Sequence, residues 1–202
     1  EETPDYPVTV FLSREGYFKK ITPQSLRMSG EQKYKEGDGL AQTFETTNRA
    51  EVMFFTDKCQ VYKSRLSEFD DSKASVLGDY LPSKLGFDEG ESVRFLVLPG
   101  DYSGHIFFFF ENGKAARVAL SRRRLTGAYS DRSPVVQFMV LTEDREIALY
   151  STEPRALIVN TALMVPKSTR TTQGVNVLTM KPKYRLDHVC LVEESGIRNL
   201  AR

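Results

Sequence analysis

Three basic side chains recur at one position of a repeated sequence pattern. Lys20, Lys63 and Arg117 each stand four residues after the centre of a short polar turn. A surface that follows a nucleic-acid backbone needs positive charge at regular intervals, because phosphates recur regularly and contacts to them need no reading of bases. We therefore predict that these three side chains lie on one basic rim and bind phosphates. The alternative is a solvated strand face without a ligand.

Other charged residues are segregated along the chain, although the net charge is only +1. Residues 114–132 hold six bases, including Arg122, Arg123 and Arg124, against one acid. Residues 155–185, with Lys167 and Arg170, hold six bases and no acid, whereas residues 68–91 hold seven acids and two bases. A folded body with a basic rim and an acidic sector would attract a polyanion on one side only. We expect Arg122, Arg123 and Arg124 to bind phosphate, the alternative being a solvated loop.

Residues suited to catalysis or metal binding do not form a recognisable pattern. His105 and His188 have no Cys or His neighbour at metal-ligand spacing, and glycine-rich phosphate loops and the Gly-x-Ser-x-Gly pattern are absent. The adjacent carboxylates Asp70-Asp71 and Glu193-Glu194 stand in polar turns, where solvated charges are the usual outcome. We expect no catalytic residue, metal site or cofactor in this chain.

The basic residues are positioned by strand pairs that recur along the chain. An apolar strand, a tight charged turn and a second strand occur four times, and a fifth copy begins at Cys190. Turn residues at Gly16, Cys59, Gly113, Pro154 and Gly196 give steps of 43, 54, 41 and 42 residues. Such a period is typical of a propeller or solenoid, because one unit cannot bury its apolar face alone.

Short runs rich in Phe, Tyr and β-branched residues, without a long helical period, predict an all-β fold. We expect one repeat domain over residues 1–202, with repeats at 5–44, 45–100, 101–142 and 143–184 and a partial copy at 185–202. The longer second step predicts an insertion at residues 82–91. The partial copy should pair near the N-terminus or complete the last repeat unit, and Phe107–Phe110 should lie in a core.

The chain has no apolar run long enough for a membrane span, and its acidic first residues do not form a signal peptide. Its two cysteines, Cys59 and Cys190, form no framework, so reduced thiols are expected. A soluble, cytoplasmic protein is the expectation from these features.

Taken together, the units FLSREGYFKKI and FFTDKCQVYKSRLSEF and the step Thr172–Val175 resemble the repeats of a known family. The family is the C-terminal domain of the A subunit of bacterial type IIA topoisomerases, DNA gyrase and topoisomerase IV. The resemblance covers nearly the whole chain. It implies a β-pinwheel, a propeller-like disc of about four to five blades that exchange strands, and a domain that binds and bends duplex DNA.

The resemblance also implies partners and a location. The partners are double-stranded DNA, the ATPase B subunit, and the rest of the A subunit; the location is the bacterial cytoplasm with its nucleoid. Cleavage chemistry, ATP and Mg²⁺ belong to other parts of such an enzyme. DNA-binding residues expected on these grounds are Lys20, Arg27, Lys33, Lys35, Lys63, Arg65, Arg117, Arg122, Arg123, Arg124, Lys167 and Arg170.

One stretch departs from the family pattern. Gyrase A subunits carry a box of Gln, paired Arg and Gly that the family uses to wrap DNA, and residues 25–37 stand in its place here. They keep the bases Arg27, Lys33 and Lys35 but include Glu31 and Glu36 and lack an Arg pair. This favours a topoisomerase IV-like subunit or a divergent gyrase. The alternatives to DNA binding are a propeller-like protein-interaction module and a propeller enzyme, the latter disfavoured by the lack of clustered acids and histidines.

Overall fold

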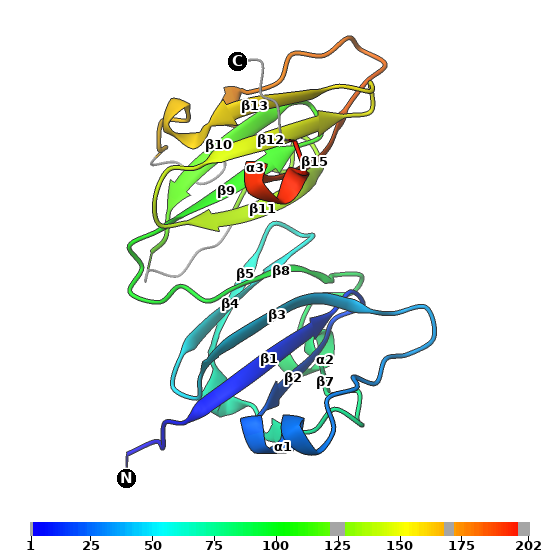
Figure 1. The fold of residues 1–202 in the computed structure, drawn as a ribbon, viewed down its shortest axis with the longest axis vertical. Coiled ribbons are helices and arrows are strands. Elements are labelled where there is room, and N and C mark those ends of the chain that lie inside the picture. The colour runs from blue at the N-terminus through cyan, green and yellow to red at the C-terminus, as the bar shows by residue number, and fades with distance from the viewer. Residues whose placement is uncertain (1, 122–127, 168–171, 198–202) are drawn as a thin grey trace. The chain divides into compact units, whose positions relative to one another are not determined.

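A computed structural model describes residues 2–121, 128–167 and 172–197. The chain divides into two compact units, unit 1 at residues 1–100 and unit 2 at residues 101–202. The division falls where the sequence predicts the border between the second and third repeats. Strands dominate both units (Figure 1), which confirms the all-β prediction. None of the described helices is long and apolar enough to cross a membrane.

Unit 1 holds two sheets, one for each of its repeats. The first has the order β3-β1-β2-β6 with β7 also on β2, and the second has the order β5-β4-β8. The elements are β1 (Pro7–Ser13), β2 (Tyr17–Ile21), α1 (Pro23–Met28), β3 (Leu40–Thr47), β4 (Glu51–Thr56), β5 (Val61–Arg65), η1 (Leu66–Glu68), β6 (Asp71–Ser72), β7 (Asp79–Tyr80), α2 (Leu81–Leu85) and β8 (Val93–Val97).

Unit 2 repeats this plan in the sheets β11-β9-β10-β14 and β13-β12-β15. Its elements are β9 (His105–Phe110), β10 (Lys114–Ala119), β11 (Val135–Leu141), β12 (Glu146–Ser151), β13 (Ala156–Asn160), η2 (Thr161–Leu163), β14 (Val175–Asn176), β15 (Leu186–Leu191) and α3 (Val192–Ser195). Each of the first three repeats thus supplies a first, a second and a third strand to its own sheet, and the last sheet takes its third strand, β15, from the partial copy at residues 185–202.

The hairpin turns share one hydrogen bond. The backbone N–H of Gly16, Cys59 and Gly113 donates to the carbonyl three residues earlier, at 3.1, 3.1 and 3.0 Å. All three residues have a positive φ, of 97°, 57° and 86°. Glycine reaches this region without a Cβ penalty, so Cys59 is the strained copy of the turn. The fourth turn, at Pro154, lacks this bond because proline has no N–H.

Strands are exchanged between consecutive repeats. Strands β6 and β7 belong to the second repeat but pair with β2 of the first, and β14 of the fourth repeat pairs with β10 of the third. A glycine precedes each antiparallel exchange strand: Gly78, with φ of 95°, and Gly174, with φ of 77°. A Cβ on either would lie within 2.5 Å of the carbonyl oxygen of Phe18 or Ala115 respectively, two residues past the preceding turn. Only glycine allows that approach.

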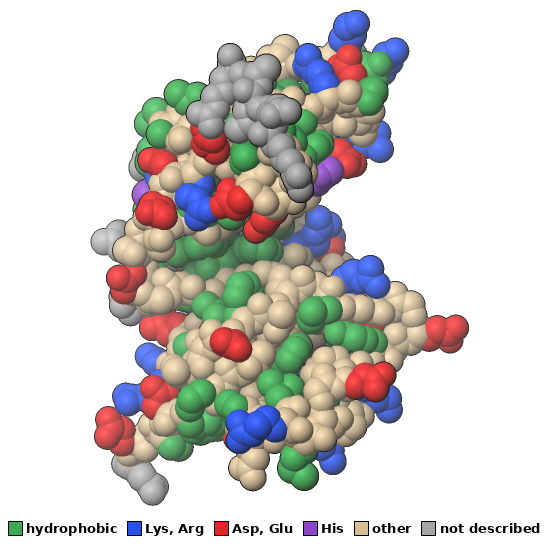
Figure 2. All heavy atoms as spheres, viewed as in Figure 1, with side chains coloured by type: hydrophobic (Ala, Val, Ile, Leu, Met, Phe, Trp, Pro, Cys, Tyr) green, Lys and Arg blue, Asp and Glu red, His purple; other side chains and the backbone are tan. Residues whose placement is uncertain are grey.

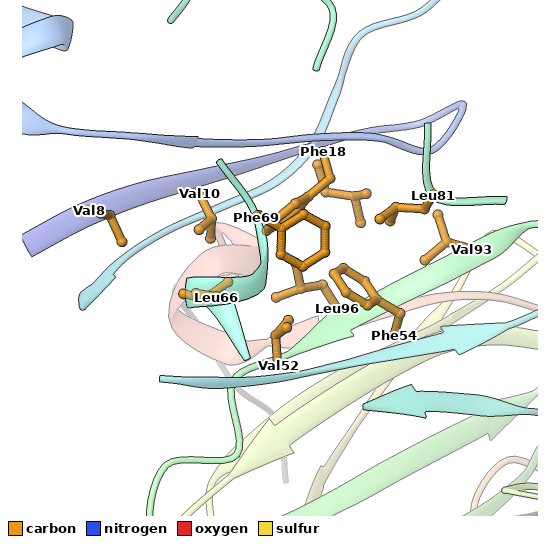
Figure 3. Close-up of a cluster of buried hydrophobic side chains, with 11 residues drawn as sticks. Val8, Val10, Phe18, Val52, Phe54, Leu66, Phe69, Leu81, Val93 and Leu96 are labelled. Atoms are coloured by element: carbon orange, nitrogen blue, oxygen red, sulfur yellow. The ribbon is translucent and has the colours of Figure 1, made fainter. Parts of the chain in front are cut away.

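Each unit buries its own apolar core between its two sheets. In unit 1, Phe18, Phe54 and Phe69 meet edge to face with ring centroids 4.8–6.2 Å apart (Figure 3). In unit 2, Phe107 and Phe109 pack with Ile147 and Leu149. All four residues of Phe107–Phe110 are fully buried, which confirms the prediction of a core position.

The expected insertion and the expected partial fifth copy can both be located in the structure. The predicted insertion at residues 82–91 contains most of helix α2 and the turn after it. The partial fifth copy completes the last sheet, because β15 pairs with β12, as one of the two expected outcomes. It is not a hairpin, however: β15 runs into α3, and Gly196, with φ of 74°, ends that helix in the left-handed region. Glycine is frequent both at helix ends and in turns, so its position alone did not distinguish the two.

Candidate nucleic-acid interface

Lys20 lies inside unit 1 and not on a rim. Its side chain is 2 % exposed, and its Nζ donates to Asn48 Oδ1 at 2.6 Å and to the Leu66 carbonyl at 3.0 Å. The Asp71 carboxylate lies 3.4 Å from the same Nζ. A buried ammonium needs such partners, because an unpaired charge in the interior is costly. Lys20 is therefore a structural cation, which corrects the prediction that it contacts phosphate.

Arg117 has the equivalent role in unit 2. Its side chain is 12 % exposed, and its Nη1 lies 2.9 Å from Asp144 Oδ1 and within 3.3 Å of the Thr161 and Met164 carbonyls. The guanidinium also lies over the ring of Phe107. His105 is next to it: burial first, and then the charge of Arg117, lower the pKa of this imidazole. Arg117 is thus engaged within the protein, which again corrects the predicted rim position.

Lys20 and Arg117, here called the clamp residues, hold the next repeat in place. Each binds a carbonyl seven residues past the following turn residue, at Leu66 in η1 and at Thr161 in η2. At two of the three copies, Lys20 and Arg117, the basic residue at this position therefore contacts the next repeat. A sequence period marks equivalent environments, and the shared environment here is the junction between repeats and not a solvent-facing surface.

The exposed bases of residues 25–37 are interspersed with acidic side chains. Arg27, Lys33 and Lys35 are exposed. Lys33, however, shares a groove of about 430 Å³ with Asp70, Asp71 and Asp79. The positive potential that a phosphate would meet there is reduced by these carboxylates. Lys35 Nζ lies 5.5 Å from the centre of the Tyr17 ring, and a hydrogen bond to Tyr17 raises the pKa of Lys35.

The remaining predicted residues have mixed positions. Lys63 is half-buried and Arg65 is exposed at the end of β5. Lys167 is half-buried, and its backbone N–H donates to the Arg117 carbonyl at 2.9 Å. Arg122, Arg123, Arg124 and Arg170 lie outside the described residues. Phosphate contact by Lys63, Arg65, Lys167 and these four arginines stays a prediction.

A second feature recurs in every repeat and reaches the surface. The backbone N–H two residues before the turn residue donates to the carbonyl of the residue directly before the third strand. We call the hairpin turn and the loop that this bond joins the corner of the repeat. The four bonds are Arg14 to Gly39 at 2.8 Å, Asp57 to Ser92 at 3.0 Å, Glu111 to Pro134 at 2.8 Å, and Thr152 to Arg185 at 2.9 Å. Each corner thereby brings the hairpin turn and the loop before the third strand together.

The fourth-repeat corner gathers four exposed bases of unit 2. It comprises the turn at Ser151–Arg155 and the loop at residues 179–185, tied together also by a bond from Arg155 Nη2 to the Thr179 carbonyl at 3.1 Å. Figure 2 shows Lys and Arg side chains around this corner, with acidic side chains among them. Its exposed bases are Arg155, Lys181, Lys183 and Arg185.

The fourth-repeat corner has one acidic neighbour in its turn, Glu153, whose carboxylate lies 3.6 Å from Arg155 Nε. The same corner in the second repeat carries the exposed acids Asp57, Asp88 and Glu89. Corner geometry is thus shared while corner charge differs. Four bases on two neighbouring loops suit a polyanion, because each can pair with a separate phosphate without reading a base.

Sequence reasoning did not select these four bases as individual site residues. The signal was present, since they all fall in the acid-deficient part of residues 155–185. Among the described residues, no group of three or more His, Cys, Asp or Glu side chains could hold a metal ion.

Comparison with known proteins gives a consistent set of relatives. No protein-family model matches the chain. Over 123 residues, 56 % of the chain, it is 26 % identical to the DNA gyrase A protein of Mycoplasma pneumoniae, and the match covers 14 % of that protein. The chain therefore spans only a small part of this relative.

Three solved structures share the fold. The C-terminal domain of DNA topoisomerase IV has a TM-score of 0.80 and 19 % identity, over 95 % of this chain and 62 % of that one. The C-terminal domain of E. coli ParC gives 0.69 and 16 %, over 91 % and 78 %. The DNA gyrase A C-terminal domain gives 0.62 and 15 %, over 94 % and 66 %. The resemblance inferred from the repeats is confirmed, and so is the β-pinwheel fold.

Proposed function

We propose that this chain is a non-catalytic domain that binds and bends duplex DNA in the A subunit of an ATP-dependent type IIA DNA topoisomerase. The observation that carries the proposal is the fourth-repeat corner, where four exposed bases meet on a strand-exchanging fold. The relatives named above support it, since each is a gyrase A or topoisomerase IV protein.

The mechanism is electrostatic. Bases of the corner neutralise phosphates and release counterions, which favours binding to any duplex sequence. Bending a duplex of about 20–30 base pairs costs on the order of 1–6 kcal/mol, so several simultaneous contacts are needed to hold a curve. The corner supplies one anchor for such a curve, and Arg122, Arg123 and Arg124 are candidates for a second.

The proposal includes the partners expected of such a domain. These are double-stranded DNA, the rest of the A subunit with the cleavage residues, and the ATPase B subunit, all in the bacterial cytoplasm at the nucleoid. Lys33 contributes little because it lies beside three aspartates. This charge pattern supports bending of the DNA without full wrapping. In gyrase A subunits, full wrapping depends on the box of Gln, paired Arg and Gly that residues 25–37 replace here.

The test compares two charge-removing variants of the whole chain. The corner variant replaces Arg155, Lys181, Lys183 and Arg185 by Ala, and the matched control replaces the exposed bases Arg27, Lys33 and Lys35 by Ala. Affinity for a mixed-sequence duplex of about 40 base pairs is measured over a series of salt concentrations.

If about five phosphates are neutralised, log K of the parent chain falls against log salt with a slope of roughly −4 to −5. The corner variant should lose up to about three units of slope and bind all sequences more weakly, while the control should change by less than about one unit. Full binding by the corner variant would move the contact to Arg122, Arg123 and Arg124, tested by their triple replacement with Ala. A parent chain that does not bind the duplex would favour a protein-interaction module.

A further inference from the structure

The third hairpin turn contains an asparagine followed by glycine, the pair most open to spontaneous deamidation. Asn112 precedes Gly113, whereas the other asparagines precede larger residues: Asn48 precedes Arg, Asn160 precedes Thr, Asn176 precedes Val and Asn199 precedes Leu. A backbone nitrogen can attack the side-chain amide carbon of the asparagine before it, and glycine hinders this attack least because it has no Cβ. Asn112 is exposed, so water reaches its side chain.

The turn itself does not require asparagine at this place. The residue directly before the turn residue is Glu15 in the first repeat and Lys58 in the second. The backbone contact at this position is also shared. The Glu15 N–H donates to Asp38 Oδ1 at 3.0 Å, and the Asn112 N–H donates to Ser133 Oγ at 3.1 Å. The contacts of the Asn112 side chain therefore decide what this residue does.

Both polar atoms of the Asn112 side chain are held by hydrogen bonds. Its Oδ1 accepts from the Lys114 N–H at 3.1 Å, and its Nδ2 donates to Gln173 Oε1 at 2.9 Å. Gln173 stands two residues before β14, the strand that the fourth repeat contributes to the third sheet. The side chain that would react is thus fixed by the segment that carries β14.

The backbone of Gly113, the attacking residue, is held as well. Its N–H donates to the Phe110 carbonyl at 3.0 Å, and its φ is 86°. This is the pattern of a type I turn followed by a glycine bulge, in which the residue before the glycine has a ψ of about 0°. Ring closure between Gly113 N and Asn112 Cγ requires rotation away from that ψ. Such rotation breaks the hydrogen bond between Gly113 and Phe110.

The segment around β14 leaves no room for this rotation. The Gly113 carbonyl accepts from the N–H groups of Val177 and Leu178 at 3.0 and 3.2 Å. A Cβ built on Gly113 would lie 2.2 Å from the Leu178 carbonyl oxygen, so the two backbones are in close contact. Residues 173–178, here called the guard segment, therefore hold the turn from both ends of β14. The reaction requires this segment to separate from the turn, and local opening of that kind costs free energy.

We propose that Asn112 is a site of spontaneous deamidation that the guard segment protects. When the segment opens, Gly113 N bonds to Asn112 Cγ, the Cγ–Nδ2 bond breaks, and the amide group leaves with the Gly113 amide proton as ammonia. Water then opens the resulting succinimide ring. Addition of water at Cγ gives aspartate, and addition at the backbone carbonyl carbon of residue 112 gives isoaspartate, whose main chain runs through Cβ and Cγ. This site does not depend on the proposed function.

Isoaspartate at position 112 prevents the guard segment from closing as before. The main chain of the turn is then one carbon longer, so the N–H and the carbonyl of Gly113 no longer meet their partners. Because β10 and β14 join the third repeat to the fourth, one modified residue loosens this junction. The isoaspartate form, separated from the parent chain, should show faster hydrogen exchange of the Val177 and Leu178 amides.

The test follows product formation in the full chain at one mildly alkaline pH. Peptide mapping by mass spectrometry measures deamidation at position 112, and chromatography separates the aspartate and isoaspartate peptides. The folded chain is compared with the same chain in urea, where the guard segment is open. Product should form at least about tenfold faster in urea. Asn112→Glu, which introduces the residue type of the first repeat, should give no product at this position.

A pair of variants tests the guard segment in the folded chain. Gln173→Ala removes the partner of Asn112 Nδ2 and should speed product formation about threefold. The matched control is Gln60→Ala, which removes a 3.3 Å bond from Gln60 Nε2 to the Lys58 carbonyl in the second hairpin and should leave the rate unchanged. Urea denaturation shows that the two variants have similar free energies of unfolding.

Three results would overturn the proposal. The first is a folded parent chain that reacts as fast as the chain in urea, because the guard segment would then give no protection. The second is the absence of product in urea, because Asn112 would then not be a reactive site. The third is an equal rate for Gln173→Ala and Gln60→Ala, because the contact to Asn112 would then have no effect on the reaction.

Discussion

Replacement of Lys20 by Met separates a structural role from a DNA-binding role. Methionine keeps an unbranched side chain of similar length but removes the ammonium, so Asn48 Oδ1 and the Leu66 carbonyl lose their donor in a buried site. A hydrogen bond to a charged group contributes about 1.5–3 kcal/mol. The Asp71 side chain is 44 % exposed, so water solvates its carboxylate once the ammonium is removed. Loss of this ion pair therefore adds little to the loss of stability.

Summed over the two buried acceptors and reduced for relaxation, the loss should be roughly 2–4 kcal/mol of the free energy of unfolding of unit 1. Urea denaturation of the full chain measures this loss. Hydrogen exchange localises it, with the Leu66 amide, bonded to Ala50, among the first to lose protection. The control is Lys73→Met, which removes an exposed lysine of the same unit and should stay within about 0.5 kcal/mol.

Affinity for DNA gives the opposite readout. Because Lys20 is buried, K20M that is still folded should bind a duplex with the same salt slope as the parent chain. The reasoning is refuted if K20M unfolds with nearly the parent free energy yet loses about one unit of salt slope, which is the result for a side chain that contacts one phosphate.

Three further predictions concern backbone strain and pH. Gly174→Ala should lower the free energy of unfolding of unit 2 by at least about 2 kcal/mol, because the added Cβ has no space. The control Gly90→Ala has the same φ of 77° but open space around it, so it should cost only the roughly 1 kcal/mol of a left-handed alanine. Equal losses in urea denaturation would contradict this reasoning. Cys59→Gly should raise the free energy of unfolding by up to about 1 kcal/mol, because φ is 57° at this turn residue, and an unchanged or lower value would argue against strain there. Burial, and then the hydrogen bond and charge of Glu91, raise the pKa of Tyr62 to about 12. The neutral phenol is thus favoured in the folded state, so its contribution is complete below about pH 10 and lost as the pH rises toward 12, and Y62F should remove this part of the pH dependence measured by denaturation.

Several features of the fold could be predicted from the sequence because they are local. A polar turn with glycine between two apolar runs predicted the hairpins at Gly16 and Gly113. The period of these hairpins indicated four equivalent units, and the run Phe107–Phe110 could only be accommodated in a core. Gly196 shows the limit, since the same residue also ends a helix and no local signal separated the two.

The candidate site was less accessible to sequence reasoning, because it depends on which neighbours surround each side chain. The recurrence of Lys20 and Arg117 showed that both occupy equivalent places, but strand exchange turns those places toward the next repeat and buries them. Lys33 is far in sequence from the aspartates that share its groove.

The distribution of charge along the sequence also does not predict which charged side chains lie together on the surface. Arg155 and Arg185 are thirty residues apart in sequence, and hydrogen bonds from Thr152 to Arg185 and from Arg155 to Thr179 bring their loops together. The sequence alone thus determined the strands, the turns and their number of copies, because turn chemistry and apolar patterning act over a few residues. Tertiary structure decided which bases are buried and which are exposed together, because long-range pairing sets the solvation and the partners of a charge.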